Sequence, residues 1–305
     1  LDMLPFPARH LLPMDKYKVF NKNMVLGTIL TSRGCPFNCI FCSSSLLFGK
    51  KFRARSPKNV VDEIEQFQET YKTRYVEFID DTFTFDKKRA EEICREIIRR
   101  KLDVSWVCSC RVDLISKELM KLLKKAGCRM IYFGVESGVQ RVVNLIRKGI
   151  KLEQAEKVMR WAREVGIETV ASFVIGVPGE TWEEALQTIK FAKKLDPDYA
   201  QFSIATPFPG TEFYEYLEKN GYLKTKNLSE YLDEHGHQKC VVNYPWLTAE
   251  EIEELVDEIL KKFYLSPSYA IILSRQIFRR KGLEELKRIL CAVIAFYHYI
   301  KRKKT

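Results

Sequence analysis

Between residues 25 and about 215, short apolar runs alternate with longer amphipathic runs, and this alternation limits the possible folds more than any other feature of the chain. The short runs are rich in β-branched and aromatic residues and end in polar or glycine-containing stretches, which is typical of strands. We expect six strands, at residues 25–31, 75–79, 104–110, 130–135, 168–175 and 199–204. We expect helices between them, at residues 57–71, 87–100, 116–126, 152–165 and 182–195.

Strands that alternate with helices predict an α/β fold with a parallel sheet and right-handed crossovers. An open doubly wound sheet and a full or partial α/β barrel both fit this pattern, and both place their chemistry at the carboxyl ends of the strands. After about residue 225 the alternation stops, and helices are expected at residues 248–263, 268–279 and 283–301. We therefore expect a barrel domain over residues 25–225 and a helical extension over residues 226–305.

Pro5, Pro7 and Pro13 oppose regular structure in residues 1–24, so we interpret this stretch as a linker. The chain has no run of the roughly 18 apolar residues that cross a bilayer, and we see no secretory signal, so we expect a cytoplasmic protein. The formal net charge is +11. Such a charge favours anionic partners such as RNA or anionic lipid, and a basic soluble surface explains it equally well.

Three cysteines, Cys35, Cys39 and Cys42, follow the first expected strand with the spacing C-x3-C-x2-C. Gly34 and Pro36 predict that they lie on a loop rather than a helix. Three thiolates are one fewer than the four that close an electron-transfer iron–sulfur cluster, so a [4Fe–4S] cluster held here would keep one iron open to a ligand. Two alternatives remain at this point: a zinc site completed by His235 or His237, and unrelated core cysteines. The other cysteines are scattered and predicted to be buried apolar residues: Cys94, Cys108, Cys110, Cys128, Cys240 and Cys291.

The motif C-x3-C-x-aromatic-C, with Phe41 in the aromatic position, resembles the signature of the radical S-adenosylmethionine (SAM) superfamily, and the resemblance extends over residues 25 to about 215. It implies an incomplete (β/α)6 barrel of the TIM type. It also implies that Cys35, Cys39 and Cys42 hold a [4Fe–4S] cluster whose open iron chelates the amino and carboxylate groups of SAM. Reductive cleavage of SAM then produces a 5′-deoxyadenosyl radical that abstracts a hydrogen atom from the substrate.

Polar residues at the second and fourth strand ends are candidate SAM contacts. Asp80 and Asp81 follow the second strand, where two acids are placed to meet a cationic group. The alternative is a capping role for the helix that starts near Lys87, which Asp86 could fill better. Glu136 and Ser137 stand among glycines after the fourth strand. The family resemblance implies that the former segment binds the SAM amino group and that the latter contacts the ribose or amino group.

The remaining strand ends supply further candidates. Arg111 would meet a carboxylate, or would support the barrel through an ion pair with an acid such as Asp113. The family resemblance implies that an apolar side chain of the fifth strand, Val174 or Ile175, packs on adenine, and strand alternation lets at most one of them face the pocket. Pro207 lies in a rigid turn that the resemblance places at the adenine side, and which could equally just terminate the barrel.

The Asp80-Asp81 pair, the proline-containing N-terminal stretch and residues 262–269 resemble radical SAM enzymes that carry a cobalamin-binding domain. That subgroup includes methyltransferases and cyclases acting on tetrapyrroles, lipids and natural products, so cobalamin is implied through a domain that is not in this sequence. The chain begins with Leu1, which is consistent with a missing upstream domain. A reductant such as ferredoxin or flavodoxin is the implied protein partner.

Two other functions remain open: an RNA-modifying radical SAM enzyme resembling the methylthiotransferases, and a non-catalytic iron–sulfur protein. Net charge supports the first, but the sequence has neither a second three-cysteine set nor a small β-barrel RNA module. Residues 289–300 are nearly all apolar or aromatic and are flanked by lysines and arginines. A helix of this kind either packs against the barrel or lies on an anionic membrane surface.

Overall fold

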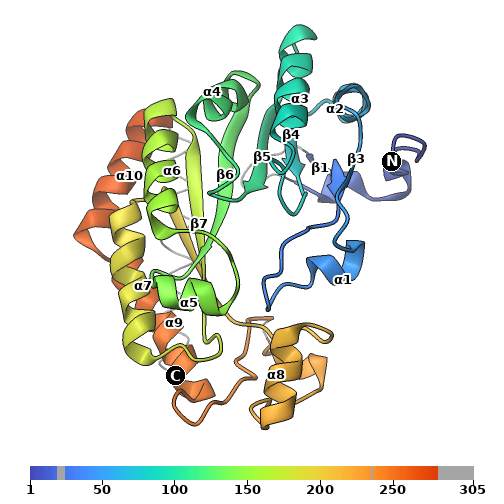
Figure 1. Ribbon diagram of the computed structural model, residues 1–305. Helices are drawn as coiled ribbons and strands as arrows, with labels where there is room; N and C mark the ends of the chain where they lie inside the picture. Colours follow the sequence, from blue (N-terminus) through green and yellow to red (C-terminus); the bar gives the residue numbers. More distant parts are fainter. Residues whose placement is uncertain (19–24, 235, 281–305) are drawn as a thin grey trace.

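The computed structural model of the protein describes residues 1–18, 25–234 and 236–280 (Figure 1). Its centre is a six-stranded sheet in the order β1–β4–β5–β6–β7–β8, and all neighbouring strands are parallel. The strands are β1 (Leu26–Ile29), β4 (Tyr75–Phe78), β5 (Ser105–Cys110), β6 (Cys128–Glu136), β7 (Glu168–Ile175) and β8 (Tyr199–Ile204). Within the described residues β1 and β8 end the sheet without pairing with each other, so the sheet is an incomplete barrel as predicted.

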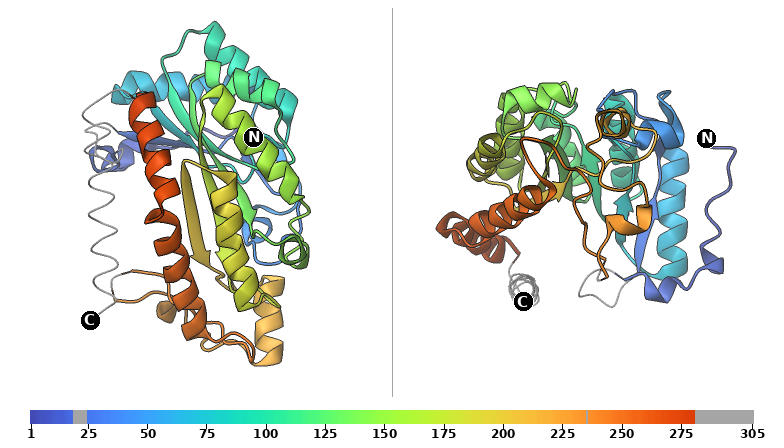
Figure 2. Two further views of the ribbon diagram at one scale, coloured as in Figure 1. Left: turned by 90° about the vertical axis from the view of Figure 1, so that its left-hand side faces the viewer. Right: turned by 90° about the horizontal axis from the view of Figure 1, so that it is seen from below.

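Five helices connect these strands and lie against one face of the sheet (Figure 2). They are α2 (Pro57–Tyr71), α3 (Lys87–Arg99), α4 (Lys117–Lys125), α6 (Leu152–Val165) and α7 (Trp182–Leu195). Most of them start at a side-chain cap, for example Ser56, whose hydroxyl accepts a hydrogen bond from the Asn59 N–H, and Thr181, which forms a capping box with Glu184. Such caps satisfy N–H groups that the first helical turn leaves without partners.

The helix-covered face of the sheet carries the hydrophobic core. Phe78 of β4 stacks on Phe83 and meets the Trp106 ring edge-on, and all three are fully buried. Towards the β8 edge of the sheet, Phe173 stacks on Phe202, which meets Phe263 edge-on. Because successive side chains of a strand point to opposite faces, the residues between these aromatics point away from the helices.

Two long helices lie in the region where the sequence predicts a helical extension, α9 (Ala249–Tyr264) and α10 (Pro267–Arg280). α9 packs on α7, β7 and β8, and the Tyr264 hydroxyl hydrogen-bonds the backbone of Ala200 in β8. The expected helix at residues 283–301, with its apolar run, lies outside the described residues. Among the helices that the structure describes, none is long and apolar enough to cross a membrane.

Several short elements were not predicted. They are the antiparallel pair β2 (Ser32–Arg33) and β3 (Arg53–Ala54), and the helices α1 (Ser44–Phe48), α5 (Gln140–Leu145) and α8 (Glu212–Asn220). The segment predicted as a linker contains two single-turn 3-10 helices, η1 (Arg9–Leu11) and η2 (Met14–Lys16), and a third, η3 (Leu228–Tyr231), lies before α9. Most of these pieces are too short to show a helical or strand period, which is the signal that sequence reasoning uses.

Candidate active site

The three cysteines lie on the loop between β2 and α1, at the carboxyl end of the sheet. Cys35, Cys39 and Cys42 are all partly buried. The Cys35 N–H donates to the Gly49 carbonyl at 3.3 Å, and the Cys42 N–H donates to the Cys39 carbonyl at 3.2 Å. The loop is tied to a neighbouring element as well, since the Ile40 N–H donates to the Ile146 carbonyl after α5 at 3.2 Å.

The thiols lie close enough to influence one another. Burial raises the pKa of Cys35, and Asp81 and Cys42 act in the same direction while Arg111 opposes them. Burial also raises the pKa of Cys39, against the positive charges of Lys148 and Arg111. Two cations therefore lie near the thiols, which is the environment that favours the deprotonated ligand form once a metal is bound.

Gly34 fixes the start of this loop. Its φ of +95° is a left-handed conformation that side chains disfavour, and a Cβ built on it would lie 2.2 Å from the Lys51 carbonyl oxygen. The chain therefore passes against the β3 side of the loop at a distance that only glycine permits. This close approach determines the direction in which Cys35 leaves the strand.

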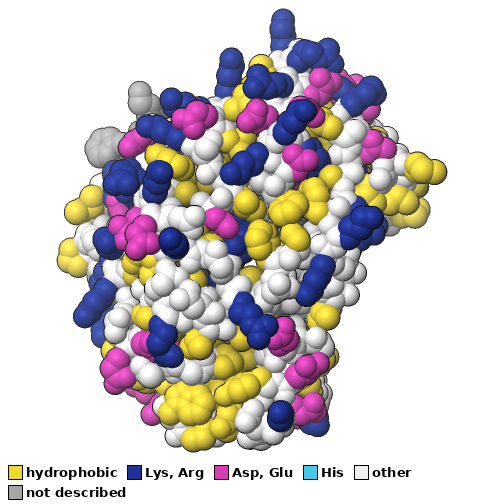
Figure 3. All heavy atoms as spheres, viewed as in Figure 1, with side chains coloured by type: hydrophobic (Ala, Val, Ile, Leu, Met, Phe, Trp, Pro, Cys, Tyr) yellow, Lys and Arg dark blue, Asp and Glu magenta, His cyan; other side chains and the backbone are white. Residues whose placement is uncertain are grey.

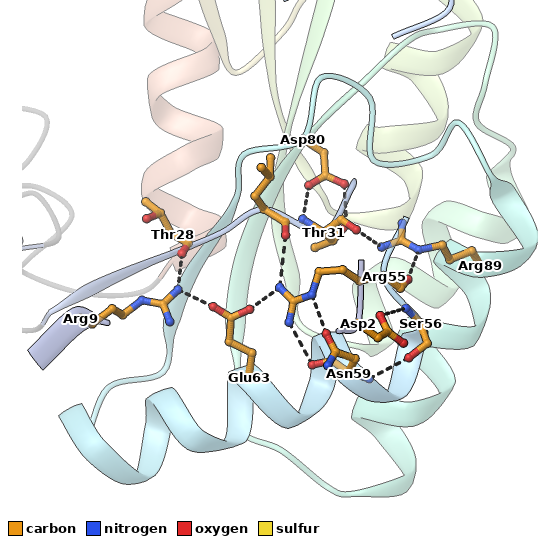
Figure 4. A network of polar contacts seen from close by, with 11 residues as sticks. Asp2, Arg9, Thr28, Thr31, Arg55, Ser56, Asn59, Glu63, Asp80 and Arg89 are labelled. Carbon is orange, nitrogen blue, oxygen red and sulfur yellow. Dashed lines mark hydrogen bonds and ion pairs between the residues drawn. The ribbon is translucent and has the colours of Figure 1, made fainter. Parts of the chain in front are cut away.

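Asp80 is buried against Thr31 and Ser32, the stem from which the cysteine loop leaves the sheet (Figure 4). It accepts a hydrogen bond from the Thr31 N–H at 2.6 Å, and the hydroxyls of Thr31 and Ser32 also bond its carboxylate. Arg89 of α3 donates to the Thr31 carbonyl at 2.8 Å from the other side. The exposed Asp81, in contrast, lies near Cys35. Of the two predicted acids, Asp80 thus contacts the stem of the cysteine loop, and Asp81 is the one that lies open beside the thiols.

A second part of the network in Figure 4 supports the end of β1 from below. Glu63 of α2 is buried and forms ion pairs with both Arg9 and Arg55. Arg9 donates to the Thr28 carbonyl at 2.7 Å, and Arg55 donates to the Leu30 carbonyl at 3.2 Å. The N-terminal segment is thereby joined to the strand that leads into the cysteine loop.

Arg111 lies beside the loop and is held by several protein groups. Its guanidinium pairs with both carboxylate oxygens of Asp113 at 3.0 Å and donates to the Lys148 carbonyl at 2.8 Å. The guanidinium carbon also stands 3.6 Å from the centre of the Phe37 ring, a cation–π contact with the cysteine loop. The ion pair with Asp113 that the sequence suggested is therefore present, and the same guanidinium borders the site, where it could also meet a carboxylate of a ligand.

Glu136 ends β6 in a left-handed conformation, with φ of +71°, and its carboxylate accepts a hydrogen bond from Lys148 at 2.6 Å. Both side chains are buried. Burial is the largest influence and acts to lower the pKa of Lys148, but Glu136 and Cys39 together outweigh it and the net shift is upward. Sequence reasoning missed Lys148, because nothing in its local pattern marks a lysine on an irregular loop as buried. Ser137, next to Glu136, instead contacts Thr188 of α7 and the Val139 N–H.

The apolar candidates separate by face. Ile175 is fully buried in the helix-side core, whereas Val174 is half-buried and points to the opposite face, so Val174 is the candidate for a contact with adenine. Phe41 is half-buried and packs against the core. Pro207 is buried, and its carbonyl accepts a hydrogen bond from the Tyr231 hydroxyl at 3.2 Å.

Three thiols on one loop form a donor set of the soft sulfur type that iron–sulfur clusters use. Among the described residues no group of three His, Cys, Asp or Glu side chains is arranged to hold a single metal ion. His237, proposed in the zinc alternative, pairs with Asp233 at 3.0 Å and borders a cavity beside α9.

Residues 29–192 match the family model of the radical SAM superfamily, more than half of the chain. The chain belongs to the radical SAM superfamily. Enzymes of this superfamily use a [4Fe–4S] cluster and SAM, so the three cysteines of the β2–α1 loop are the residues that would hold the cluster in this radical SAM protein. Bound there, the cluster would supply the electron that cleaves SAM and an open iron site that SAM occupies.

This radical SAM chain is similar to named methyltransferases. It is 42% identical over 298 residues to an uncharacterized methyltransferase of Pyrococcus horikoshii, covering 98% of this chain and 63% of that protein. It is 31% identical over 280 residues to the cytidylyl-2-hydroxyethylphosphonate methyltransferase of Streptomyces wedmorensis, covering 86% and 52% of the two chains. The chain thus spans about half to two thirds of the length of these relatives.

The fold of the chain is that of a solved radical SAM methyltransferase, TsrM of Kitasatospora setae, whose structure has cobalamin and a [4Fe–4S] cluster bound. The TM-score is 0.66 at 23% sequence identity, over 81% of this chain and 52% of TsrM. This likeness supports the incomplete barrel and leaves the substrate open.

Proposed function

We propose that this chain is the catalytic part of an enzyme that cleaves SAM reductively at a [4Fe–4S] cluster on Cys35, Cys39 and Cys42 and forms a 5′-deoxyadenosyl radical. The supporting observation is the placement of all three thiols on one loop at the carboxyl edge of a parallel sheet, beside the cations of Arg111 and Lys148. In this proposal Asp81 and Glu136 lie within reach of the SAM amino group, and Val174 faces the adenine.

The protein's own groups prepare this site in the absence of any ligand. Gly34 and Asp80 fix the stem of the loop, so the thiols need little reorganisation to meet the cluster. The Lys148 charge is held in place by Glu136, and Arg111 is held by Asp113. Charges fixed in this way beside a partly buried site act more strongly than they would in water.

For the substrate reaction we propose cobalamin-linked C-methylation or oxidative cyclisation of a lipid, tetrapyrrole or natural product, with cobalamin held outside residues 1–305. The named methyltransferases among the relatives support this direction. SAM would then serve both as the radical source and as the methyl source. An RNA substrate has less support. On the face of the molecule drawn in Figure 3, basic side chains are interspersed with acidic ones rather than gathered in one basic patch.

The test is an anaerobic assay of the chain reconstituted with iron and sulfide, given SAM and a strong reductant, with 5′-deoxyadenosine as the product measured. We expect four irons per chain and steady formation of 5′-deoxyadenosine. Single Cys35→Ala, Cys39→Ala and Cys42→Ala variants should lose both. Cys240→Ala is the matched control, since Cys240 is buried in the loop before α9 and should leave cluster and product intact.

Two results would contradict the proposal. Zinc in place of iron in the purified protein, with no cluster after reconstitution, would remove its basis. A cluster that survives replacement of any of the three loop cysteines would place the ligands elsewhere. Methyl transfer is tested separately by supplying cob(I)alamin, which takes the methyl group of SAM and leaves S-adenosylhomocysteine as the product measured. Because this proposal holds cobalamin outside residues 1–305, the assay uses this chain together with the part that binds cobalamin. Formation of 5′-deoxyadenosine without S-adenosylhomocysteine there would contradict the methyl step and leave the radical step standing.

A further inference from the structure

The sheet face opposite the helices is lined by partly exposed side chains. On β5 the burial alternates, with Val107 and Ser109 half-buried between the buried residues Trp106, Cys108 and Cys110. β4, β6 and β7 show the same alternation toward their carboxyl ends. At its carboxyl end this face reaches the cysteine loop. Gly134 of β6 lies against Glu136 and Lys148, since a Cβ added to it would touch both side chains, and this pair lies near Cys39. It is therefore the surface that a molecule reacting at the site would contact.

Glu77 of β4, next to the edge strand β1, is an acidic residue of this face. It precedes Phe78, whose ring lies in the helix-side core, so the Glu77 side chain points the opposite way. Glu77 is half-buried and has no hydrogen bond or ion pair with any residue that the structure describes. Burial raises the pKa of Glu77, and no neighbouring group offsets that cost. A partly buried carboxylate without a partner is costly unless a ligand supplies one.

Apart from Arg129 and Glu168, which face each other, the groups around Glu77 are neutral. Tyr132 of β6 lies near enough for Glu77 to raise its pKa, after the larger effect of burial. Tyr132 is paired in register with Ser109, and Ser172 of β7 with Gln201 of β8, which places hydroxyls and an amide across the same face. The nearby cation Arg129 is directed to Glu168, with 3.9 Å between the guanidinium nitrogen and the carboxylate. The face thus has one unbalanced negative charge surrounded by hydrogen-bonding and apolar groups.

We propose that Glu77 binds an ammonium or other cationic N–H group of the substrate, with Tyr132 beside it. An N–H cation would supply the hydrogen bond and the charge that Glu77 lacks, whereas a carboxylate or phosphate would meet repulsion. The half-buried apolar residues Val107, Met130 and Val174 would contact the uncharged part of the same molecule. This inference rests on the proposed function for its setting and names the class of substrate that the site accepts.

The test measures binding of three probes with one skeleton to the reconstituted full chain: phenethylammonium, phenethyl alcohol and phenylpropanoate. Dissociation constants come from saturation-transfer NMR under anaerobic conditions. We expect the ammonium probe to bind about tenfold more tightly than the alcohol, as a charge-assisted hydrogen bond provides, and phenylpropanoate to bind most weakly. Glu77→Gln should abolish this order, and Glu69→Gln, which removes one acid from the exposed surface of α2, should preserve it.

Equal binding of the three probes to the wild-type chain, or no binding of the ammonium probe at millimolar concentration, would overturn the inference. So would an ammonium preference that persists in Glu77→Gln. If Glu77→Gln fails to fold, the order in which the wild-type chain binds the three probes still decides the inference. A chain that forms 5′-deoxyadenosine without ammonium preference loses only this inference, and a chain that prefers ammonium without forming a cluster loses only the proposed function.

Discussion

Lys148 and Glu136 form a buried ion pair, with 2.6 Å between Nζ and Oε1, directly against the backbone of Gly134. The pair joins the end of β6 to the loop after α5, and that loop also accepts a hydrogen bond from Ile40 of the cysteine loop. One ion pair therefore connects the sheet edge to the segment that carries the thiols.

We predict that Lys148→Met lowers the free energy of unfolding by about 3 kcal/mol, because it leaves Glu136 buried without its partner. The double variant Lys148→Met, Glu136→Gln should recover most of this loss, since neither buried charge remains. Urea unfolding of the wild type, both single variants and the double variant measures the coupling. Additive losses would show that the two side chains do not depend on each other.

Gly34→Ala should reduce iron incorporation several-fold, because the new Cβ would collide with the Lys51 carbonyl and displace Cys35. Gly166→Ala is the matched control. Gly166, after α6, also has a positive φ, +78°, but a Cβ added there would meet nothing within 4 Å, so this change should cost only about 1 to 2 kcal/mol and leave the cysteine loop intact. Iron per chain after reconstitution separates the two, and equal losses would refute the role of the close approach.

Asp80→Ala should cost about 2 to 3 kcal/mol, since it leaves the buried Thr31 and Ser32 donors without their acceptor. Asp2→Ala removes another acid of the network in Figure 4, one whose bond to the Ser56 N–H is exposed. That variant should change stability by less than about 0.5 kcal/mol. Thermal unfolding compares them, and similar losses for both would mean that Asp80 does not hold the stem.

Glu180 gives the protein a pH-dependent stability. Burial raises its pKa to about 8, while its carboxylate accepts a hydrogen bond from the Gly176 N–H at 2.7 Å. The folded protein thus keeps a proton that the unfolded chain loses above its ordinary pKa of 4.5. Stability should be greatest below that value and fall as pH rises to about 8, by up to roughly 1.4 kcal/mol per pH unit.

Denaturant midpoints between about pH 5 and about pH 8 test this expectation. Glu180→Gln cannot ionise and should flatten the profile, whereas Glu183→Gln, an exposed acid at the start of α7, should leave the wild-type slope. An unchanged slope in Glu180→Gln would assign the pH dependence to other groups.

Local sequence patterns determined the secondary structure of the barrel. The bounds of β7, β8, α2, α6 and α7 agree with prediction residue for residue, and the other strands and connecting helices differ by a few residues at most. The reason is local: apolar period, caps such as Ser56, and the left-handed Gly166 after α6 act within a few residues. The motif of Cys35, Cys39 and Cys42 is equally local, so the family could be recognised from it.

Tertiary structure decided which side chains face the site. Alternation showed that Val174 and Ile175 point apart, but only the packing of the helices shows that Val174 faces the open side. The same packing places Cys108 and Cys110 in the helix-side core, away from that face. Lys148 meets Glu136 across an intervening helix, and Glu77 has no hydrogen bond or ion pair with the residues that the structure describes around it. A sequence specifies two faces of a strand, and only the folded chain decides what covers each of them.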